Sequence, residues 1–196
     1  INNVRDMPIL NELFEEKLKQ EMLLNTYKTE LKKLDNRERE VIVAASKSMR
    51  HILSLAEKAA MNNSNVLIQG ETGVGKGVIA KLIYDMSMRN DKPMISINCG
   101  AIPENLLESE LFGYAPGAFT GASSSGKAGL FEIADKGVIF LDEIGELHAS
   151  LQPKLLSFLE TGEFVRVGST KVKKVDCRII AATNKNLKEM VDAGEF

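Results

Sequence analysis

Val66-Leu-Ile-Gln-Gly-Glu-Thr-Gly-Val-Gly-Lys76 joins a short apolar run to a glycine-rich turn that ends in lysine. A candidate helix, 76–88, follows at once, so the turn stands between a strand and a helix. Successive backbone N–H groups of such a turn can point at phosphate oxygens, and the helix N-terminus adds partial positive charge. This context favours a nucleotide-phosphate site over an ordinary glycine turn. The residues that we expect to contact the nucleotide are Gly70, Glu71, Thr72, Gly73, Val74, Gly75, Lys76, Gly77 and Val78.

The rest of the chain alternates short apolar runs with helical stretches. The runs 66–68, 94–97, 138–141 and 178–182 have the β-branched character of strands that are buried on both faces. Helices are expected at 76–88, 104–111 and 151–160, and a further apolar-periodic stretch runs from Met49 to Ala60. The segments 164–167 and 171–175 flank Gly168-Ser-Thr170 and predict a hairpin before the last strand. The fold class is therefore α/β, with a parallel sheet covered by helices in three layers.

A second acidic motif, Val138-Ile-Phe-Leu-Asp-Glu143, places two carboxylates at the end of a predicted strand. It resembles the Walker B motif of P-loop ATPases. Because side chains alternate along a strand, we expect Asp142 and Glu143 to point in different directions. Asp142 is assigned to Mg²⁺ and its water shell, and Glu143 to polarising the attacking water. The alternative is a pair of acids that caps the next helix.

Between these two motifs lies Gly117-Ala-Phe-Thr-Gly-Ala122, within Glu110-Leu-Phe-Gly-Tyr-Ala-Pro-Gly-Ala-Phe-Thr-Gly-Ala122. Such small residues cannot fill a core, and glycines let the backbone bend, so Phe119 should be presented rather than packed. The stretch resembles the signature loop of the AAA+ ATPases that activate sigma-54 RNA polymerase. The motifs that carry this resemblance occur in the family's order and span 41–196.

The resemblance implies a P-loop AAA+ domain that binds ATP and Mg²⁺ and remodels the closed complex of sigma-54 RNA polymerase holoenzyme. It implies that Asn98 holds the catalytic glutamate away from water, although an asparagine in a strand-end turn is the alternative. Asn184 resembles the sensor I asparagine, which reports the γ-phosphate. With Lys76, Asp142 and Glu143, these two complete the catalytic set. The residues implied to contact the sigma factor are Gly117, Ala118, Phe119, Thr120, Gly121 and Ala122.

Gly77 departs from the general pattern of the phosphate loop, because a serine or threonine hydroxyl normally binds Mg²⁺ at this position. Glycine offers no side-chain oxygen, so the metal would rely on phosphates, water and Asp142. This departure motivates an alternative function, a nucleotide-sensing regulatory module that does not use hydrolysis. Another AAA+ machine, such as an unfoldase, is disfavoured by the intact 117–122 loop.

The region 1–36 predicts a linker helix with a heptad seam, in which Lys17 and Gln20 are polar interruptions. The apolar positions of the seam are Leu10, Leu13, Leu24, Tyr27, Leu31 and Leu34. We expect this helix to dimerise as a coiled coil, and the alternative is an amphipathic helix that lies on its own domain. The ATPase domain then occupies 37–196. By the resemblance, the longer parent forms a hexameric or heptameric ring. It also carries arginine fingers and a helical lid beyond this chain, and without them we expect the fragment to hydrolyse ATP very slowly.

Composition narrows the class of protein further. A net charge of -2 with interspersed charges gives no basic footprint, so direct DNA binding by this segment is not expected. Cys99 and Cys177 have neither zinc nor disulfide spacing and are interpreted as reduced thiols. The sequence has no apolar run of membrane-spanning length, and we expect a cytoplasmic protein without membrane contact.

Overall fold

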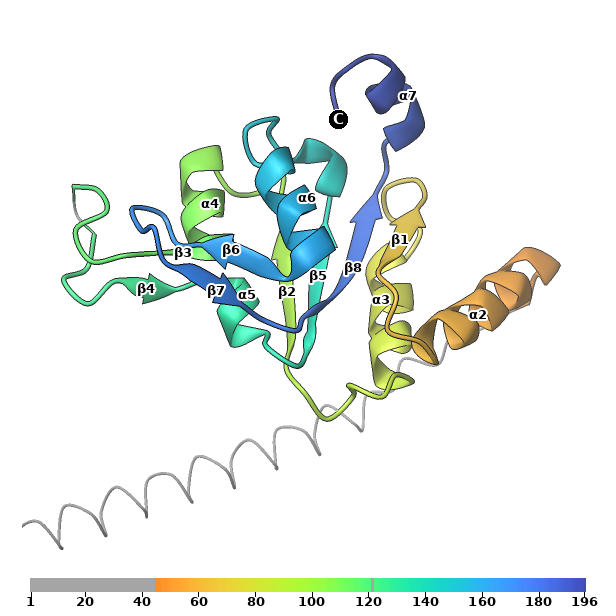
Figure 1. The fold of residues 1–196 in the computed structure, drawn as a ribbon. Helices are drawn as coiled ribbons and strands as arrows, with labels where there is room; N and C mark the ends of the chain where they lie inside the picture. Colours follow the sequence, from red (N-terminus) through yellow and green to blue (C-terminus); the bar gives the residue numbers. More distant parts are fainter. Residues whose placement is uncertain (1–44, 121) are drawn as a thin grey trace, which may run out of the picture. The chain divides into compact units, whose positions relative to one another are not determined.

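The computed structural model describes residues 45–120 and 122–196, and Ser46–Phe196 forms one compact unit (Figure 1). The predicted coiled coil, 1–36, and Gly121 lie outside the described residues. The helices are α2 (Lys47–Ala60), α3 (Lys76–Asp85), α4 (Glu104–Phe112), α5 (Leu130–Ile133), the 3₁₀ turn η1 (Ile144–Glu146), α6 (Gln152–Thr161) and α7 (Leu187–Asp192). The strands are β1 (Val66–Gln69), β2 (Met94–Asn98), β3 (Gly113–Tyr114), β4 (Lys127–Ala128), β5 (Val138–Asp142), β6 (Glu163–Val165), β7 (Val172–Lys174) and β8 (Arg178–Thr183).

The central sheet has the order β1-β8-β5-β2, and every pairing in it is parallel. Parallel strands end at a common edge, so the residues that follow β1, β2, β5 and β8 meet there. Figure 1 shows this edge beside the loop that joins β1 to α3. The topology therefore collects the predicted phosphate loop, both acids and both asparagines at one side of the sheet.

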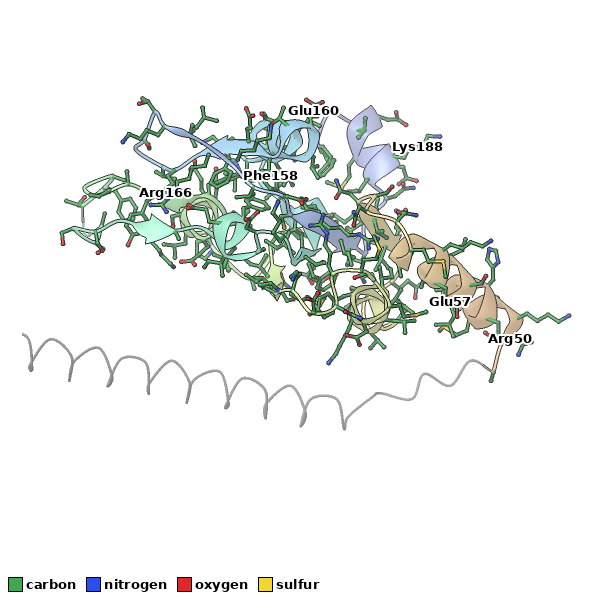
Figure 2. The ribbon with its side chains drawn as sticks, turned by 60° about the horizontal axis from the view of Figure 1, so that its bottom comes forward. Arg50, Glu57, Phe158, Glu160, Arg166 and Lys188 are labelled. Carbon is green, nitrogen blue, oxygen red and sulfur yellow. The ribbon has the colours of Figure 1, made fainter. Side chains whose placement is uncertain are left out.

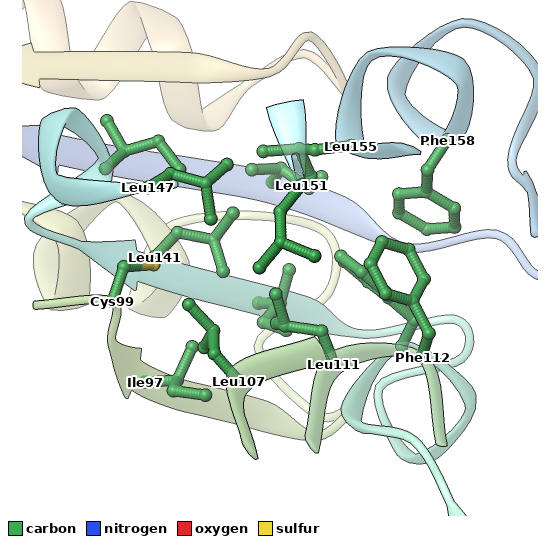
Figure 3. Packing of buried hydrophobic residues seen from close by; sticks show 14 of the residues in the cluster. Ile97, Cys99, Leu107, Leu111, Phe112, Leu141, Leu147, Leu151, Leu155 and Phe158 are labelled. Atoms are coloured by element: carbon green, nitrogen blue, oxygen red, sulfur yellow. The ribbon is translucent and has the colours of Figure 1, made fainter. Parts of the chain in front are cut away.

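Two hydrophobic cores cover the two faces of the sheet. Alternation along β5 sends Ile139 and Leu141 into one core, with α4 and α6, and Val138 and Phe140 into the other, with α2 and α3. Figure 3 shows side chains of the first core from β2, α4, β5 and α6 packed together. This is the predicted three-layer α/β arrangement, in which the strands are buried on both faces.

The buried Arg178, at the start of β8, fastens the sheet to α2. Its Nη2 donates to Ala59 O at 2.6 Å and its Nε donates to Ser64 O at 3.1 Å. Only 2% of the residue is exposed, and burial lowers the pKa of the guanidinium. These bonds fix the end of the strand that lies opposite the predicted nucleotide site.

The four predicted strands are confirmed, and each extends one residue further than predicted. The helix predicted at 76–88 ends instead at Asp85, because Ser87 Oγ donates to Tyr84 O at 2.7 Å and closes the last turn. The predicted hairpin exists but is shorter, with Val165 opposite Val172. Val167 leaves it to bond β3, where its N donates to Gly113 O and its O accepts from Ala115 N, both at 2.9 Å. Across residues 45–120 and 122–196, no helix has the length and apolarity needed to cross a membrane.

Candidate functional site

The predicted phosphate loop wraps around the amine of Lys76. Gly73 and Gly75 have φ of 83° and 90°, a left-handed conformation that favours glycine, and Gly75 leads directly into α3. Lys76 Nζ donates to the carbonyls of Gly70 and Glu71, at 2.9 Å each. The ammonium therefore lies over the loop at the N-terminus of α3. A phosphate group bound there would meet both the ammonium charge and the partial positive charge of the helix N-terminus.

The end of β8 is hydrogen-bonded to the phosphate loop. Asn184 Nδ2 donates to Thr72 Oγ1 at 3.0 Å, and Gly70 N donates to Thr183 O at 3.1 Å. Gln69 Nε2 adds a bond to Lys185 O at 2.8 Å. The structure thus brings the predicted sensor asparagine against the predicted nucleotide-binding residues.

The strand alternation from which we predicted the directions of Asp142 and Glu143 does not reach Glu143. β5 ends at Asp142, and Glu143 has φ 53° and ψ 43°, a left-handed conformation that is unfavourable for a residue with a side chain. Asp142 Oδ1 accepts the N–H of Glu143 at 2.9 Å. Glu143 therefore leaves the strand through a sharp turn that re-aims its carboxylate, as is common at functional sites.

Asn98 is paired with Asp142 across β2 and β5, but its side-chain oxygen is used by its own turn. Its Oδ1 accepts from Gly100 N at 2.8 Å and from Ala101 N at 3.0 Å. No hydrogen bond between Asn98 and Glu143 is among those of the described residues. The strand-end turn is thus present, and a contact between the Asn98 amide and the catalytic glutamate stays a prediction.

Gly100 makes room for the Glu143 carboxylate. A Cβ at position 100 would lie 2.6 Å from Glu143 Oε2, closer than real contacts allow. Glu143 also lines a hollow of about 440 Å³, together with Cys99, Gly100, Ile102, Glu104, Leu107, Glu146 and His148. The carboxylate is therefore reachable by water, as a residue that polarises a water molecule must be.

Cys99 is buried and Cys177 is half-buried, and both are free thiols. Burial raises the pKa of Cys99 to about 12, with a further contribution from the charges of Asp142 and Glu143, and burial likewise raises the pKa of Cys177 to about 12. Both thiols therefore stay protonated near neutral pH and are poor nucleophiles.

Packing does not explain the glycine at position 77. A Cβ there would find Phe140 Cε1 at 4.0 Å, which is an ordinary contact. A Cβ would therefore fit at position 77, and contact with the surrounding residues does not by itself demand glycine there. In the described part of the chain, no cluster of three or more histidine, cysteine or acidic residues could hold a metal ion.

The loop 117–122 extends from the β3–β4 stem, at the end of the domain away from α2 (Figure 1). Phe119 is 46% exposed, Gly117 and Thr120 are exposed, and Ala118 and Ala122 are half-buried. Lys127 Nζ holds the stem to α4 by donating to both carboxylate oxygens of Glu110, at 2.6 and 2.7 Å. Phe119 is thus only partly presented to solvent, because its ring also packs against Tyr114.

The β6–β7 hairpin is bound to α5 through Glu132, a residue that the sequence did not single out. Arg166, labelled in Figure 2, donates from Nε and Nη2 to the two carboxylate oxygens at 2.6 and 2.7 Å, and Lys173 Nζ donates at 2.5 Å. The Glu132 side chain is only 14% exposed. Arg166 and Lys173 therefore anchor the hairpin to α5.

Glu132 should make the stability of this domain depend on pH in the acid range. Burial alone raises the pKa of Glu132, but hydrogen bonds from Arg166 and Lys173 outweigh it and lower the pKa from 4.5 to about 2. Because the folded pKa is the lower one, this stabilisation is present above about pH 4.5 and is lost as the pH falls toward 2. It amounts to at most about 3 kcal/mol. Urea unfolding of wild type and Glu132→Gln should therefore differ most at neutral pH, and the difference should shrink below pH 4.5 and vanish only near pH 2.

Glu160→Gln is a matched control, because Glu160 is an exposed carboxylate near the end of α6 (Figure 2). It should stay within about 0.5 kcal/mol of wild type at every pH, as surface substitutions usually do. A difference between wild type and Glu132→Gln that is constant from pH 7 to 3 would contradict the assignment.

Comparison with known proteins identifies the family. A family model described as "Sigma-54 interaction domain" matches residues 42–196. The chain belongs to the sigma-54 interaction domain family. Its fold is the P-loop AAA+ fold of sigma-54 activators, as the resemblance predicted.

Two of the similar proteins are named as a regulatory protein and as a transcriptional activator. The Nif-specific regulatory protein of Azorhizobium caulinodans is 49% identical over 155 residues, and the formate hydrogenlyase transcriptional activator FhlA of Escherichia coli is 50% identical over 155 residues. Each match covers 79% of this chain. The chain spans 25% of the first regulator and 22% of the second, and 52% of another relative from Pseudomonas sp. (strain NS671).

Solved structures agree with the fold. NtrX from Brucella abortus matches with a TM-score of 0.77 and 35% identity, over 91% of this chain and 39% of that one. NtrX in complex with ATP matches with a TM-score of 0.75 and 34% identity, over 91% of this chain and 40% of that one. This sigma-54 interaction domain thus resembles a protein that has been observed with bound nucleotide.

Proposed function

We propose that this sigma-54 interaction domain binds ATP with Mg²⁺ at the edge where β1, β5 and β8 end, and that it hydrolyses the γ-phosphate. The observation that carries the proposal is the Asn184–Thr72 hydrogen bond of 3.0 Å, which joins the end of β8 to the phosphate loop. A group bound at the loop would meet Asn184, Lys76 and the two acids from separate elements. The ATP complex of NtrX supports the choice of nucleotide.

Each residue has a chemical role in this proposal. The backbone of Gly70–Lys76 cradles the phosphates, and the Lys76 ammonium stabilises charge on the β- and γ-phosphates. Asp142 would hold Mg²⁺ through its water shell, and the ion when bound neutralises phosphate charge. Glu143 polarises the attacking water. Asn98 lies on the neighbouring strand and restrains the Glu143 carboxylate. One carboxylate with phosphates and water suits Mg²⁺, which retains several waters in such sites.

We further propose that the loop 117–122 contacts the sigma-54 RNA polymerase holoenzyme and uses hydrolysis to remodel its closed complex. Phe119 supplies the apolar contact, and Gly117, with φ 71°, supplies a hinge. The β6–β7 hairpin supports the loop through Val167 and runs directly into β8, which ends beside Asn184. This continuous connection supports coupling between nucleotide and loop. Assembly into a ring, dimerisation through 1–36 and a cytoplasmic location complete the proposal.

Gly77 favours a second candidate, a domain that senses ATP or ADP without using hydrolysis. With no hydroxyl at this position, the metal has one ligand fewer in the loop. The test uses a longer protein that carries arginine fingers. If that protein exchanges bound ATP for ADP slowly and releases no measurable phosphate, the second candidate is the correct one.

Binding of purified sigma-54 to the chain tests the primary proposal. We expect binding with ADP and a γ-phosphate analogue to be about tenfold tighter than with ADP alone, a free-energy difference of about 1.4 kcal/mol. Lys76→Ala serves as a control that does not bind the nucleotide, so its affinity for sigma-54 should be the same under both conditions. Equal affinity of the wild-type chain under both conditions would reject the proposal.

A further inference from the structure

Phe119 is not free in solvent, because the edge of one ring meets the face of another at Tyr114. The ring centroids of Tyr114 and Phe119 lie 5.0 Å apart with an interplanar angle of 62°. This edge-to-face arrangement is attractive, because the positive edge of one ring meets the negative face of the other. With 46% of Phe119 exposed, part of its surface is covered inside the domain.

Tyr114 is held firmly on both sides of its backbone. On one side it pairs with Lys127 of β4, and on the other it forms a parallel bridge with Val167. The flanking bonds from Val167 N to Gly113 O and from Ala115 N to Val167 O are both 2.9 Å. The tyrosine ring therefore stands on a small three-stranded frame that includes the β6–β7 hairpin.

The segment that carries Phe119 is joined to this frame by short local contacts. Ala118 N donates to Ala115 O at 3.2 Å, and Ala122 N donates to Phe119 O at 3.0 Å. Ala118 also lies close to Gly168, where an added Cβ would be 2.7 Å from the Ala118 Cβ. The loop thus rests on the hairpin and on Tyr114, and none of these contacts belongs to the hydrophobic core.

We propose that Tyr114 is a seat for Phe119: it holds the ring in a resting position that Phe119 must leave in order to grip sigma-54. Tyr114 is thus a positioning residue that competes with the partner for the same aromatic ring. The functional half of this inference rests on the proposed contact between Phe119 and sigma-54. An aromatic pair of this kind shifts a two-state population by about 2- to 12-fold.

Fluorine NMR of the 196-residue chain tests the seat without sigma-54. The sequence has three tyrosines, Tyr27, Tyr84 and Tyr114, so 3-fluorotyrosine gives three signals, and Tyr114→Phe identifies the third. Phe119→Leu should shift the Tyr114 signal and leave the other two unchanged. Thr120→Ala, a loop variant that keeps the Phe119 ring, should leave all three in place. An unchanged Tyr114 signal in Phe119→Leu would overturn the proposal.

The competition is tested by the affinity for sigma-54 in the presence of a γ-phosphate analogue. Tyr114→Leu removes the aromatic seat and should bind about 2- to 12-fold more tightly than wild type. Tyr114→Phe keeps the ring and loses only the contact of its hydroxyl with Ser123 N at 3.5 Å, so it should bind as wild type. Unchanged or weaker binding of Tyr114→Leu, at an unchanged melting temperature, would overturn the competition. If wild type binds no sigma-54, the proposed function fails, while the NMR result still decides whether the seat exists.

Discussion

Replacing Lys76 with alanine is expected to lower the affinity of the chain for ATP by about 100-fold or more. Hydrogen bonds to charged groups contribute about 1.5 to 3 kcal/mol each, and Lys76 would make such bonds to two phosphates. In the structure its Nζ already lies between the carbonyls of Gly70 and Glu71, at the N-terminus of α3. Isothermal titration calorimetry with a non-hydrolysable ATP analogue and Mg²⁺ measures the loss.

Two further variants make the result specific. Lys76→Arg keeps the charge but not the compact ammonium, so it should bind between wild type and Lys76→Ala. Lys188→Ala removes an exposed lysine on α7 and should bind as wild type. An affinity of Lys76→Ala within threefold of wild type, in a folded protein, would show that the nucleotide does not lie on this loop.

Phe119→Ala is expected to reduce open-complex formation at a sigma-54 promoter by at least about 30-fold in a longer regulator that contains this domain. Aromatic residues at the centre of an interface commonly contribute 2 to 4 kcal/mol or more to binding. The ATPase rate should stay within about twofold of wild type, because the ring lies outside both hydrophobic cores. Transcription from a supercoiled sigma-54 promoter and phosphate release measure the two activities in parallel.

Leu106→Ala is the matched control for this experiment. Leu106 is an exposed apolar residue in the first turn of α4, at 51% exposure against 46% for Phe119, and it is not part of the loop sequence. It should leave both activities unchanged. Transcription that survives Phe119→Ala would remove the loop from the proposed mechanism, whatever the ATPase rate.

The sequence predicted those parts of the fold that arise from local pattern. The β-branched runs became the four central strands, and the glycines at positions 73 and 75 adopted the left-handed backbone that a phosphate loop requires. Local signals sufficed here because burial on both faces and positive φ each demand particular residue types. Asn184 was singled out by resemblance, and its place beside the phosphate loop is explained by the parallel strands, which end at one edge.

Other features depended on contacts between distant segments. Nothing local shows that Val167 would leave its hairpin to bond β3, or that Glu132 would face Arg166 and Lys173. The left-handed turn at Glu143 was also missed, because strand alternation gives no sign of where a strand stops. Each of these features depends on contacts between segments that are distant in the sequence. The periodicity of apolar residues along the chain gives no information about such contacts.

β8 has a mechanical consequence for any signal that passes through the domain. It is hydrogen-bonded to β1 on one side and to β5 on the other, and Arg178 ties its first residue to α2. Such a strand cannot slide, because a shift of one residue would turn its buried side chains to the wrong faces. If nucleotide and loop are coupled as we propose, we therefore expect β8 to move together with β1 and β5 rather than to slide along them.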